Sequence, residues 1–576
     1  MIKVKELKPI FDPVLHQNLR DLVNYAAMAY DEDTAFIIKH KLSKKEFTYE
    51  NISFRRFRDE INGFGTALLK RGLQGKRIAI IGNNSYEWLL SHLAIVNGLG
   101  ISVPLDKGLP YDELESSAIR SAASVIIFDK AHQAIVEELK ENGNTQITDY
   151  ICMDELEGYE DVQTLINEGQ DLIEEGMDDY MNLPIDKDAM SILLFTSGTT
   201  SMAKAVMLSH YNITYDIYSM MQVEDIRHGD VNMAFLPYHH TFGATGQLLM
   251  IAAGATTAYC EGLKYVQKNI VEYKVSVFVC VPLLIESIYK RIMATVKKEG
   301  KEKKLKTGIK LSRMLLKLGI DRRRQLFREI HEQLGGNLRY VISGASALDP
   351  VAAKGFDDIG ILAYQGYGMT EASPCIAAET SEEHKAGSIG RAMPGIQVAI
   401  DNPNEEGIGE LIARGPNVML GYYENEEETA EALKDGWLHT GDLARLDKDG
   451  YIYICGRKKN VIVLKNGKNV YPEELETLIA NLPYVEDSMV FGQPKREGDD
   501  KDLALCAKIT YSRDVMKDIY GVTDPTEIEA VIRKDIDHIN EELPVYKQML
   551  RLIVTDQPMI KTTTGKVKRY EEIKKN

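Results

Sequence analysis

Leu193–His210 reads LLFTSGTTSMAKAVMLSH, and this stretch indicates more about the fold and function of the chain than any other. The apolar run from Ser191 to Phe195 predicts a buried strand. A loop of hydroxyl side chains with one glycine follows, and Lys204 comes next. Small residues let backbone N–H groups approach an anion closely, and hydroxyls with one ammonium group complete a phosphate site. The stretch therefore predicts that the chain binds a polyphosphate.

Two other structures could contain such a loop. A P-loop has a second glycine just before its lysine and a Ser or Thr just after it. Ala203 and Ala205 stand at these places, which argues against a Walker-type NTPase. An ordinary polar turn between two strands stays open on this stretch alone, because Ser/Thr/Gly clusters are common in loops.

The chain before this stretch alternates between apolar runs and amphipathic segments. Residues 77–84 (RIAIIGNN) predict a strand and a turn, residues 85–100 predict a helix that a glycine ends, and residues 101–106 predict the next strand. Because this alternation continues through most of the first 450 residues, the sequence predicts an α/β fold with largely buried strands.

The pattern of apolar, turn and charged residues changes twice toward the end of the sequence. After about residue 384, short alternating strands separated by Gly, Asn and Asp predict a smaller β-rich subdomain. After Arg457, a lysine-rich strand pair precedes helices predicted at 472–481 and 526–543. The sequence thus divides into parts of different composition.

The composition narrows the class of protein. A chain of 576 residues is long enough for two to four domains. Its net charge of −17 argues against general nucleic-acid binding, which requires a basic footprint. The six cysteines lack the spacing of a zinc site and read as reduced thiols of a cytoplasmic protein. The first residues, MIKVKELKPIFDP, lack the apolar core of a signal peptide.

One segment departs from the acidic average. Residues 297–328 carry thirteen Lys or Arg and three acidic residues, a net charge of +10. Within them, LSRMLLKLGI has apolar residues at helical spacing. A solvated helical insertion and a basic amphipathic patch that contacts an anionic membrane both fit this pattern.

Two later segments contain residues suited to a nucleotide. YQGYGMTEASP (364–374) places glycines around Tyr367, whose ring can stack on a base, and its Glu371 is a hard ligand for Mg²⁺. Asp442 and Arg457, fifteen residues apart, could hold the two hydroxyls of a ribose. Alternatively, residues 364–374 form an ordinary turn that enters a helix, and Asp442 and Arg457 form a structural ion pair.

Two further segments carry titratable side chains. MIKTTTGKVKR (559–569) places Lys566 after a glycine near the end of the chain, where a lysine is normally solvated. FLPYHHTFG (235–243) places His239 and His240 after a proline turn. The alternative to a functional site is one buried, hydrogen-bonded histidine and one exposed histidine.

Taken together, these five motifs resemble the adenylate-forming (AMP-dependent synthetase/ligase) superfamily, which includes acyl-CoA synthetases, nonribosomal-peptide adenylation domains and luciferases. The motifs occur in the expected order, and the likeness runs from about residue 20 to the C-terminus. VISGASALDP (341–350) resembles the adenosine-binding loop of these enzymes. The basic insertion followed by LFREIHEQLGGNLRYVISGASAL most resembles long-chain fatty acyl-CoA synthetases.

The resemblance implies the architecture and the reaction. An α/β fold is expected, with a large N-terminal domain (1–457) of two α/β sheets and a β-rich subdomain (about 384–457), and a small mobile α+β C-terminal domain (458–576). The implied reaction joins a fatty acid or another carboxylic acid to AMP from ATP, with Mg²⁺, and then transfers the acyl group to coenzyme A.

The resemblance also implies roles for individual residues. Those that would contact the phosphates of ATP are Thr196, Ser197, Gly198, Thr199, Thr200, Lys204 and Thr370. Those that would frame the adenine are Ser343, Gly344, Ala345, Ser346, Gln365, Gly366, Tyr367 and Gly368. The ribose would lie on Asp442 and Arg457, and Mg²⁺ on Glu371 and Thr196.

Four further residues take roles from the same resemblance. Lys566 would be the catalytic lysine, and His240 would line the acyl site. Lys459 would be the hinge of the C-terminal domain, and Gly467 in the turn 466–468 would line the coenzyme A channel.

Departures from the family pattern leave alternatives open. Ser201, Ala203 and Ala205 replace Gly, Pro and Gly of the usual loop, which predicts altered loop motion with function retained. Ala244 stands where some long-chain enzymes have an aromatic gate, so gating of the acyl tunnel is not carried over. A ligase that loads a carrier-protein thiol and a non-catalytic nucleotide-binding protein remain alternatives to the acyl-CoA ligase.

Overall fold

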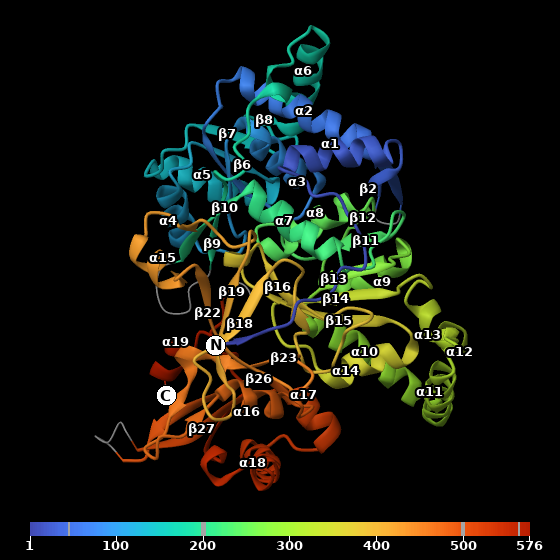
Figure 1. Ribbon diagram of the computed structural model, residues 1–576, viewed down its shortest axis with the longest axis vertical. Helices are drawn as coiled ribbons and strands as arrows, with labels where there is room; N and C mark the ends of the chain where they lie inside the picture. The colour runs from blue at the N-terminus through green and yellow to red at the C-terminus, as the bar shows by residue number, and fades with distance from the viewer. Residues whose placement is uncertain (44–45, 197–202, 497–501, 563–564, 576) are drawn as a thin grey trace.

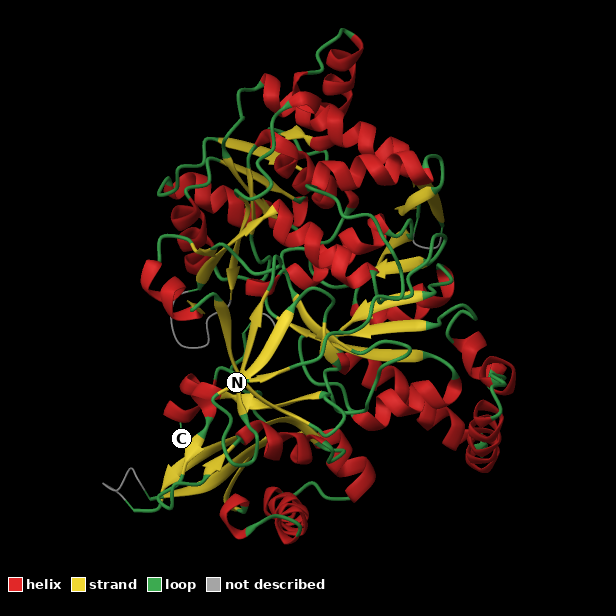
Figure 2. Cartoon of the chain, in the orientation of Figure 1, coloured by secondary structure: helices red, strands yellow, loops and turns green. Residues whose placement is uncertain are grey.

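Three large sheets, a three-stranded sheet and a two-stranded sheet organise the described part of the chain. The computed structural model describes residues 1–43, 46–196, 203–496, 502–562 and 565–575 (Figure 1). Helices surround the sheets in the upper and right-hand parts of the molecule (Figure 2). The C-terminal segment, coloured orange to red in Figure 1, lies at the lower end. The fold is therefore the expected mixed α/β arrangement.

The first sheet has eight strands in the order β20-β10-β9-β5-β4-β6-β7-β8. They are β4 (Arg77–Ile81), β5 (Ile101–Pro104), β6 (Val125–Phe128), β7 (Asp149–Cys152), β8 (Glu160–Asp161), β9 (Met190–Thr196), β10 (Lys204–Ser209) and β20 (Gly421–Tyr422). Strands β5, β4, β6, β7 and β8 run parallel to one another. The predicted strands at 77–84, 101–106 and 191–195 are confirmed by β4, β5 and β9.

Alternate residues of β4 explain why its sequence is a continuous apolar run. Ile78 and Ile80 join the hydrophobic core that includes α2 (Phe54–Lys70) and α3 (Tyr86–Ala94). Ala79 and Ile81 join the core that includes α4 (Tyr111–Ser121) and α5 (Gln133–Asn142). Because helices cover both faces of the sheet, neither face of the strand tolerates polar residues.

The second sheet has nine strands in the order β17-β16-β15-β14-β13-β11-β12-β2-β3. They are β2 (Thr34–Lys41), β3 (Phe47–Ser53), β11 (Val231–Ala234), β12 (Thr256–Tyr259), β13 (Val277–Cys280), β14 (Tyr340–Ser343), β15 (Leu362–Gly368), β16 (Cys375–Ala378) and β17 (Arg391–Ala392). Strands β12, β11, β13, β14 and β15 are parallel. Parallel strands present their carboxyl ends at one edge, where ligands of open α/β sheets bind.

The third sheet has six strands and contains most of the predicted β-rich segment. Its order is β1-β18-β19-β22-β21, and β23 pairs with β22. The strands are β1 (Ile2–Lys3), β18 (Gln397–Asp401), β19 (Gly409–Arg414), β21 (Leu433–Lys434), β22 (Trp437–Leu446) and β23 (Ile452–Arg457). Sequence patterns did not predict that the first residues of the chain pair with β18.

The residues after Arg457 form their own hydrophobic core. β24 (Ile462–Val463) pairs with β25 (Asn469–Val470), and β26 (Val485–Pro494), β27 (Leu503–Tyr511) and β28 (Met549–Thr555) form a sheet. Apolar residues of α16 (Pro472–Ala480) and α18 (Pro525–Glu541) join this core. The helices predicted at 472–481 and 526–543 are confirmed.

The basic segment forms helices at the right-hand edge of Figure 1. α11 spans Glu302–Lys317 and α12 spans Arg323–Leu326, between α10 (Pro282–Lys298) and α13 (Arg328–Gln333). None of the helices in the described ranges combines the length and apolarity needed to cross a membrane. All six cysteines are free, as expected.

Candidate functional site

The phosphate-loop residues that the structure describes lie at the two ends of a hairpin. Thr196 ends β9 and Lys204 begins β10, and the two residues are opposite each other in the antiparallel register. The Thr196 hydroxyl donates to the Lys204 carbonyl at 3.3 Å. Ser197, Gly198, Thr199 and Thr200 lie outside the described residues. The hairpin brings the predicted hydroxyl and the predicted ammonium group together.

Lys204 is held by two neighbours that face its ammonium group. Its Nζ forms an ion pair with Glu428 of α15 (Glu426–Ala432) and lies 4.8 Å from the centre of the Tyr422 ring. Tyr422 ends β20, the strand next to β10. The Glu428 carboxylate and the face of the Tyr422 ring therefore fix the ammonium group of Lys204 at the start of β10.

Glu371 lies on the other side of Tyr422. It sits in a short turn, Thr370–Ala372, and is buried, whereas Thr370 is partly exposed. The Tyr422 hydroxyl donates to Glu371 Oε1 at 2.8 Å. Burial and the neighbouring Glu371 carboxylate raise the pKa of Tyr422 well above its ordinary value. Tyr422 thus connects the lysine of the hairpin to the carboxylate predicted to bind Mg²⁺.

Tyr367, Asp442 and Arg457 form a connected cluster. Asp442 on β22 and Arg457 on β23 are opposite each other in the antiparallel pair. Asp442 Oδ1 accepts from Arg457 at 3.0 Å, and Asp442 Oδ2 accepts from the Tyr367 hydroxyl at 2.6 Å. Although burial opposes it, the Asp442 carboxylate raises the pKa of Arg457. Strand pairing thus unites two residues that are fifteen positions apart in sequence.

The predicted adenosine loop begins where β14 ends. Ser343 is fully buried there, and its hydroxyl has no hydrogen-bond partner among the described residues. A side chain at Gly344 would come within 2.8 Å of the Phe242 ring. Ala345 has a φ of 72°, a left-handed conformation that non-glycine residues rarely adopt. Such backbone outliers cluster at ligand-binding sites.

The glycines of β15 serve different purposes. A Cβ atom on Gly368 would lie 1.8 Å from the Pro374 carbonyl oxygen. Only glycine therefore fits where these two segments of the backbone approach each other. A Cβ atom on Gly366 would meet nothing closer than 4.0 Å. Gln365 is buried, and its amide donates to the Ser388 carbonyl at 3.1 Å while its oxygen accepts from the Leu348 N–H. Its side chain braces the loop after β14.

Lys566 reaches this cluster from the C-terminal part of the chain. Its backbone is fixed by hydrogen bonds with Thr562, at 3.2 Å and 2.8 Å. The surrounding protein and the Arg457 charge lower the pKa of Lys566, whereas Asp442 and Glu371 oppose that shift. Its side chain is nevertheless exposed to solvent. The carboxylates of the large domain and the lysine of the tail therefore share one site.

The two other C-terminal residues predicted to act lie differently. Lys459 is exposed in the short turn Lys458–Asn460, directly after β23. Burial and the charges of Arg457 and Lys204 lower its pKa, so it also lies close to the cluster. Gly467 lies in the exposed turn between β24 and β25, and no hydrogen bond or ion pair in the described ranges joins it to the cluster.

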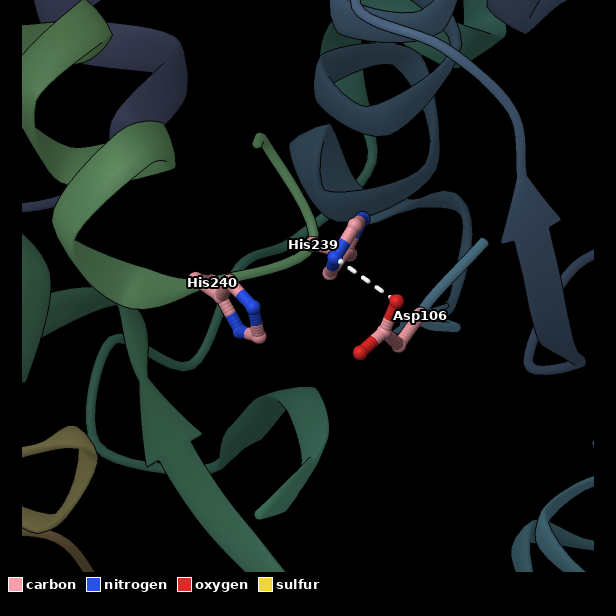
Figure 3. Close-up of side chains that lie close together, drawn as sticks. All are labelled: Asp106, His239 and His240. Carbon is pink, nitrogen blue, oxygen red and sulfur yellow. Dashed lines mark ion pairs between the residues drawn. The ribbon is translucent and has the colours of Figure 1, made fainter. Parts of the chain in front are cut away.

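His239 and His240 precede α8 (Thr241–Ala252), and Asp106 follows β5 (Figure 3). His239 is buried and lies 3.2 Å from Asp106, from Nε2 to Oδ1, and its ring is 4.4 Å from that of His240. Burial and the neighbouring His239 lower the pKa of His240 to about 4, and Lys566 contributes in the same direction. His240, which is partly exposed, is therefore neutral at pH 7 and lies near Lys566.

A cluster of three side chains and, separately, the Glu371 carboxylate could hold a metal ion. The donor atoms of Asp106, His239 and His240 all lie within 4.8 Å of one another. This set is rich in nitrogen, whereas Mg²⁺ prefers oxygen ligands and retains waters or substrate phosphates. Glu371 supplies such an oxygen, and it accepts a hydrogen bond from Tyr422, whose ring lies beside Lys204. Magnesium therefore fits Glu371 better than the histidine set.

Three residues of the site escaped prediction from the sequence. Tyr422 and Glu428 contact Lys204, and Asp106 fixes His239. Asp106 follows a predicted parallel strand, so its position at the carboxyl edge of the sheet was a usable signal. Nothing in the local sequence indicates that Glu428, 224 positions away, pairs with Lys204.

Comparisons with known proteins identify relatives of this chain. The family described as AMP-binding enzyme matches residues 24–423, and the family described as AMP-binding enzyme C-terminal domain matches residues 459–575. Long-chain-fatty-acid–CoA ligase 1 of Cavia porcellus is 29% identical over 482 residues, which cover 78% of this chain and 69% of that protein. Long-chain-fatty-acid–CoA ligase 6 of Rattus norvegicus is 26% identical and covers 92% of this chain and 78% of its own length.

Solved structures show the same fold. The anthranilate CoA ligase AuaEII in complex with anthranoyl-AMP superposes with a TM-score of 0.74 at 21% identity, covering 98% of both chains. A fatty acyl CoA synthetase of Mycobacterium tuberculosis gives 0.66 at 20% identity, covering 97% of this chain and 98% of that one. Because the family match spans more than half of the sequence, the chain belongs to the family of AMP-binding enzymes.

Proposed function

We propose that the protein is an ATP-dependent acyl-CoA ligase and that its substrate is a long-chain fatty acid. In the first half-reaction, a carboxylate oxygen attacks the α-phosphorus of ATP. The bond from that phosphorus to the bridging oxygen breaks, and pyrophosphate leaves. In the second half-reaction, the thiol of coenzyme A gives up its proton and its sulfur attacks the acyl carbon, so that AMP leaves.

One observation carries this proposal. Lys566, from the tail of the chain, lies close enough to Glu371, Asp442 and Arg457 for their charges to shift its pKa. In-line attack on phosphorus requires positioning and positive charge more than a general base. A lysine from the tail of the chain that lies near a ribose-type Asp–Arg pair suits this task.

The residues of the large domain would divide the nucleotide among them. Asp442 and Arg457 would hold the ribose hydroxyls, and Tyr367 beside them would stack on the adenine. Lys204 and the loop after Thr196 would bind the terminal phosphates, and Thr370 the α-phosphate. The fully buried Ser343 hydroxyl at the end of β14 would find its missing partner in the adenosine.

Magnesium fits this donor set at Glu371, with Thr196 as a second oxygen. The ion would neutralise phosphate charge when bound. Tyr422 donates to Glu371 Oε1, which keeps one carboxylate oxygen oriented and leaves the other for the metal. The Tyr422 ring also faces Lys204. One side chain thus sets the spacing between the cation of the loop and the metal ligand.

The second half-reaction would need another domain arrangement. Lys566 and Gly467 both lie in the C-terminal part, and of these two Lys566 lies near Asp442 and Glu371 here. Rotation about Lys459, directly after β23, would withdraw Lys566 and bring the Gly467 turn forward as a wall for pantetheine. We assign the boundary between the large domain (1–457) and this small domain (458–576) to the same position.

The carboxylate substrate would lie beside His240. This side chain is neutral at pH 7, which suits a site that receives an apolar acyl chain next to a carboxylate. Relatives named long-chain-fatty-acid–CoA ligases support a long-chain acid. Solved structures of the same fold include an anthranilate CoA ligase and an o-succinylbenzoate CoA synthetase. Acids such as anthranilate and o-succinylbenzoate are therefore the competing substrates.

A panel of carboxylic acids tests the proposal. The purified full chain is assayed for ATP–pyrophosphate exchange with saturated acids of two to eighteen carbons, benzoate, anthranilate and o-succinylbenzoate. Exchange that rises with chain length is the expected result, followed by acyl-CoA formation when coenzyme A is added. Exchange with none of the acids contradicts the ligase assignment.

The thiol acceptor is tested separately. Acyl transfer is measured to free coenzyme A and to a phosphopantetheinylated carrier protein at equal concentration. Preference for free coenzyme A supports the proposal. Transfer to the carrier alone identifies instead a ligase that loads carrier proteins.

A further inference from the structure

Helix α11 presents a face that no other described part of the chain covers. Only Ser312 of this helix is buried. Leu311, Met314 and Leu318, the last at the end of the helix, are 39%, 56% and 69% exposed. Their spacing of three and four residues places them on one side of the helix. The chain thus exposes a short apolar stripe at the edge of the molecule.

A row of lysines runs beside this stripe. Lys303, Lys306, Lys310 and Lys317 are exposed and recur every three, four and seven residues, so they also share one side of the helix. In the described ranges none of the four forms an ion pair, which distinguishes them from most charged residues nearby. We call these four lysines with Leu311, Met314 and Leu318 the α11 face.

Several other cations of the segment form ion pairs that anchor it instead. Arg313 forms a two-pronged ion pair with Asp358 of α14 (Pro350–Ile359), at 2.9 Å and 2.6 Å. Lys301 binds Glu299 and Glu329, and Arg323 binds Asp321 and Asp357. Because these pairs fix the helix on the body of the protein, the α11 face is a built surface that points outward.

The charge of the whole chain restricts what this face can bind. Residues 297–328 carry a net charge of +10, in a chain whose net charge is −17. An extended nucleic acid would be repelled by the rest of the surface. A planar anionic surface that meets only this edge would not be repelled to the same degree, because charges more than about 8–10 Å away are largely screened at physiological salt.

The apolar stripe restricts the partner further. Lysines next to exposed leucine and methionine on one helix are typical of helices that lie in the boundary between headgroups and acyl chains. The lysine stems can extend along apolar surface while their ammonium groups remain at the level of the phosphates. A purely ionic contact would not require Met314 and Leu318 to be exposed.

We propose that the α11 face docks the enzyme on the surface of an anionic lipid bilayer. The four lysines would bind lipid phosphates, and Leu311, Met314 and Leu318 would enter the upper acyl region. The helix would lie flat on the membrane without crossing it. Such docking would place the enzyme on the surface in which poorly soluble acids partition, which rests on the proposed function.

Vesicle sedimentation with the full chain tests this docking. Binding is compared for vesicles of phosphatidylcholine alone and with one quarter phosphatidylglycerol. We expect binding to the anionic vesicles only, weakened severalfold when the salt concentration rises from 0.05 to 0.5 M. Each lysine near an anionic surface contributes about a fivefold factor, so Lys306→Glu/Lys310→Glu/Lys317→Glu should reduce binding by more than about tenfold.

Matched variants separate this surface from general charge. Lys5→Glu/Lys8→Glu/Lys434→Glu changes the net charge equally at exposed lysines of other elements and should leave binding within about twofold. Met314→Ser/Leu318→Ser keeps all charges and should weaken binding severalfold. Thermal unfolding and ATP–pyrophosphate exchange with a soluble short acid report that each variant is folded and active, independently of lipid.

Several outcomes would overturn the proposal. Absence of binding to anionic vesicles by the wild-type chain would do so, as would equal loss in the two triple variants. A change from dimer to monomer in the α11 triple variant would show that a second copy of the chain covers this face. If exchange activity is absent but vesicle binding follows the prediction, the docking surface stands and the proposed function fails.

Discussion

The two halves of the candidate site are held in opposite ways. Asp442, Arg457 and Tyr367 are joined by hydrogen bonds of 3.0 Å and 2.6 Å within the large domain. Lys566 comes from the tail of the chain, its side chain is exposed, and the charges of Arg457, Asp442 and Glu371 shift its pKa. A fixed cluster suits binding of the nucleotide, whereas an exposed lysine suits the proposed mechanism, in which it acts in one half-reaction and is withdrawn for the other.

The largest effect is expected at Lys566. Lys566→Ala should slow adenylate formation about 100- to 1,000-fold, because a cation aimed at developing phosphoryl charge is lost. Thioester formation from supplied acyl-AMP should remain within about threefold of wild type. Single-turnover kinetics of the two half-reactions measure both effects. Lys574→Ala, at an exposed lysine of α19 (Arg569–Lys574), is the matched control.

The next effect concerns the metal ligand of the fixed half. Glu371→Gln should slow adenylate formation about 100-fold and raise the Mg²⁺ concentration needed for half-maximal rate. Glu428→Gln, which removes a carboxylate on the other side of Tyr422, should leave the Mg²⁺ requirement unchanged. An equal shift in both variants would show that Glu371 acts only through the general charge of the cleft.

The ribose pair should affect binding more than chemistry. Asp442→Asn removes the charged acceptor of the Arg457 and Tyr367 hydrogen bonds and should raise the KM for ATP about 10- to 100-fold. The kcat should fall much less than in Lys566→Ala. Steady-state kinetics with varied ATP check this. A kcat that falls as far as in Lys566→Ala would erase the difference between the two halves.

The pH dependence of the two half-reactions should differ. The surrounding protein and Arg457 lower the pKa of Lys566, so its ammonium group loses its proton at a lower pH than an ordinary lysine does. Adenylate formation should therefore decline on the alkaline side before an ordinary lysine titrates, and Lys566→Arg should move that decline upward. Thioester formation should lack this limb. Stopped-flow pH profiles of each step test the difference.

The smallest effect is expected at Tyr422. Tyr422→Phe keeps the ring next to Lys204 but removes the hydrogen bond to Glu371, and should slow adenylate formation about two- to tenfold. Tyr423→Phe, at the neighbouring residue whose hydroxyl accepts from Arg77, is the control. A loss of 100-fold or more would mean that the tyrosine touches the reacting groups.

How far the sequence could predict this site follows from the range of the interactions. Strand ends carry Thr196, Lys204, Ser343 and Tyr367, so local patterns predicted where these residues lie along the fold. The Asp442–Arg457 pair was suggested by a hairpin turn between two strands. The partnership of Lys204 with Glu428, and of Asp106 with His239, depends on tertiary packing that no local pattern encodes.

The approach of Lys566 to the large domain is the extreme case. Its own segment is polar and indicates only a solvated lysine, and only the resemblance implied a catalytic role. The pairing of β1 with β18 is similar, because two residues are too few to show a strand period. Predictions from sequence were strongest where one element carries the function and weakest where two distant ones share it.

Labelling with a lysine-reactive ATP analogue shows whether Lys566 and Lys204 approach the same nucleotide. An ATP analogue with a pyridoxal group on its terminal phosphate is incubated with the full chain, reduced with borohydride and mapped by peptide mass spectrometry. The account predicts label on Lys566 and Lys204, with both protected by excess ATP. Label confined to lysines outside the cleft, with no protection by ATP, would contradict it.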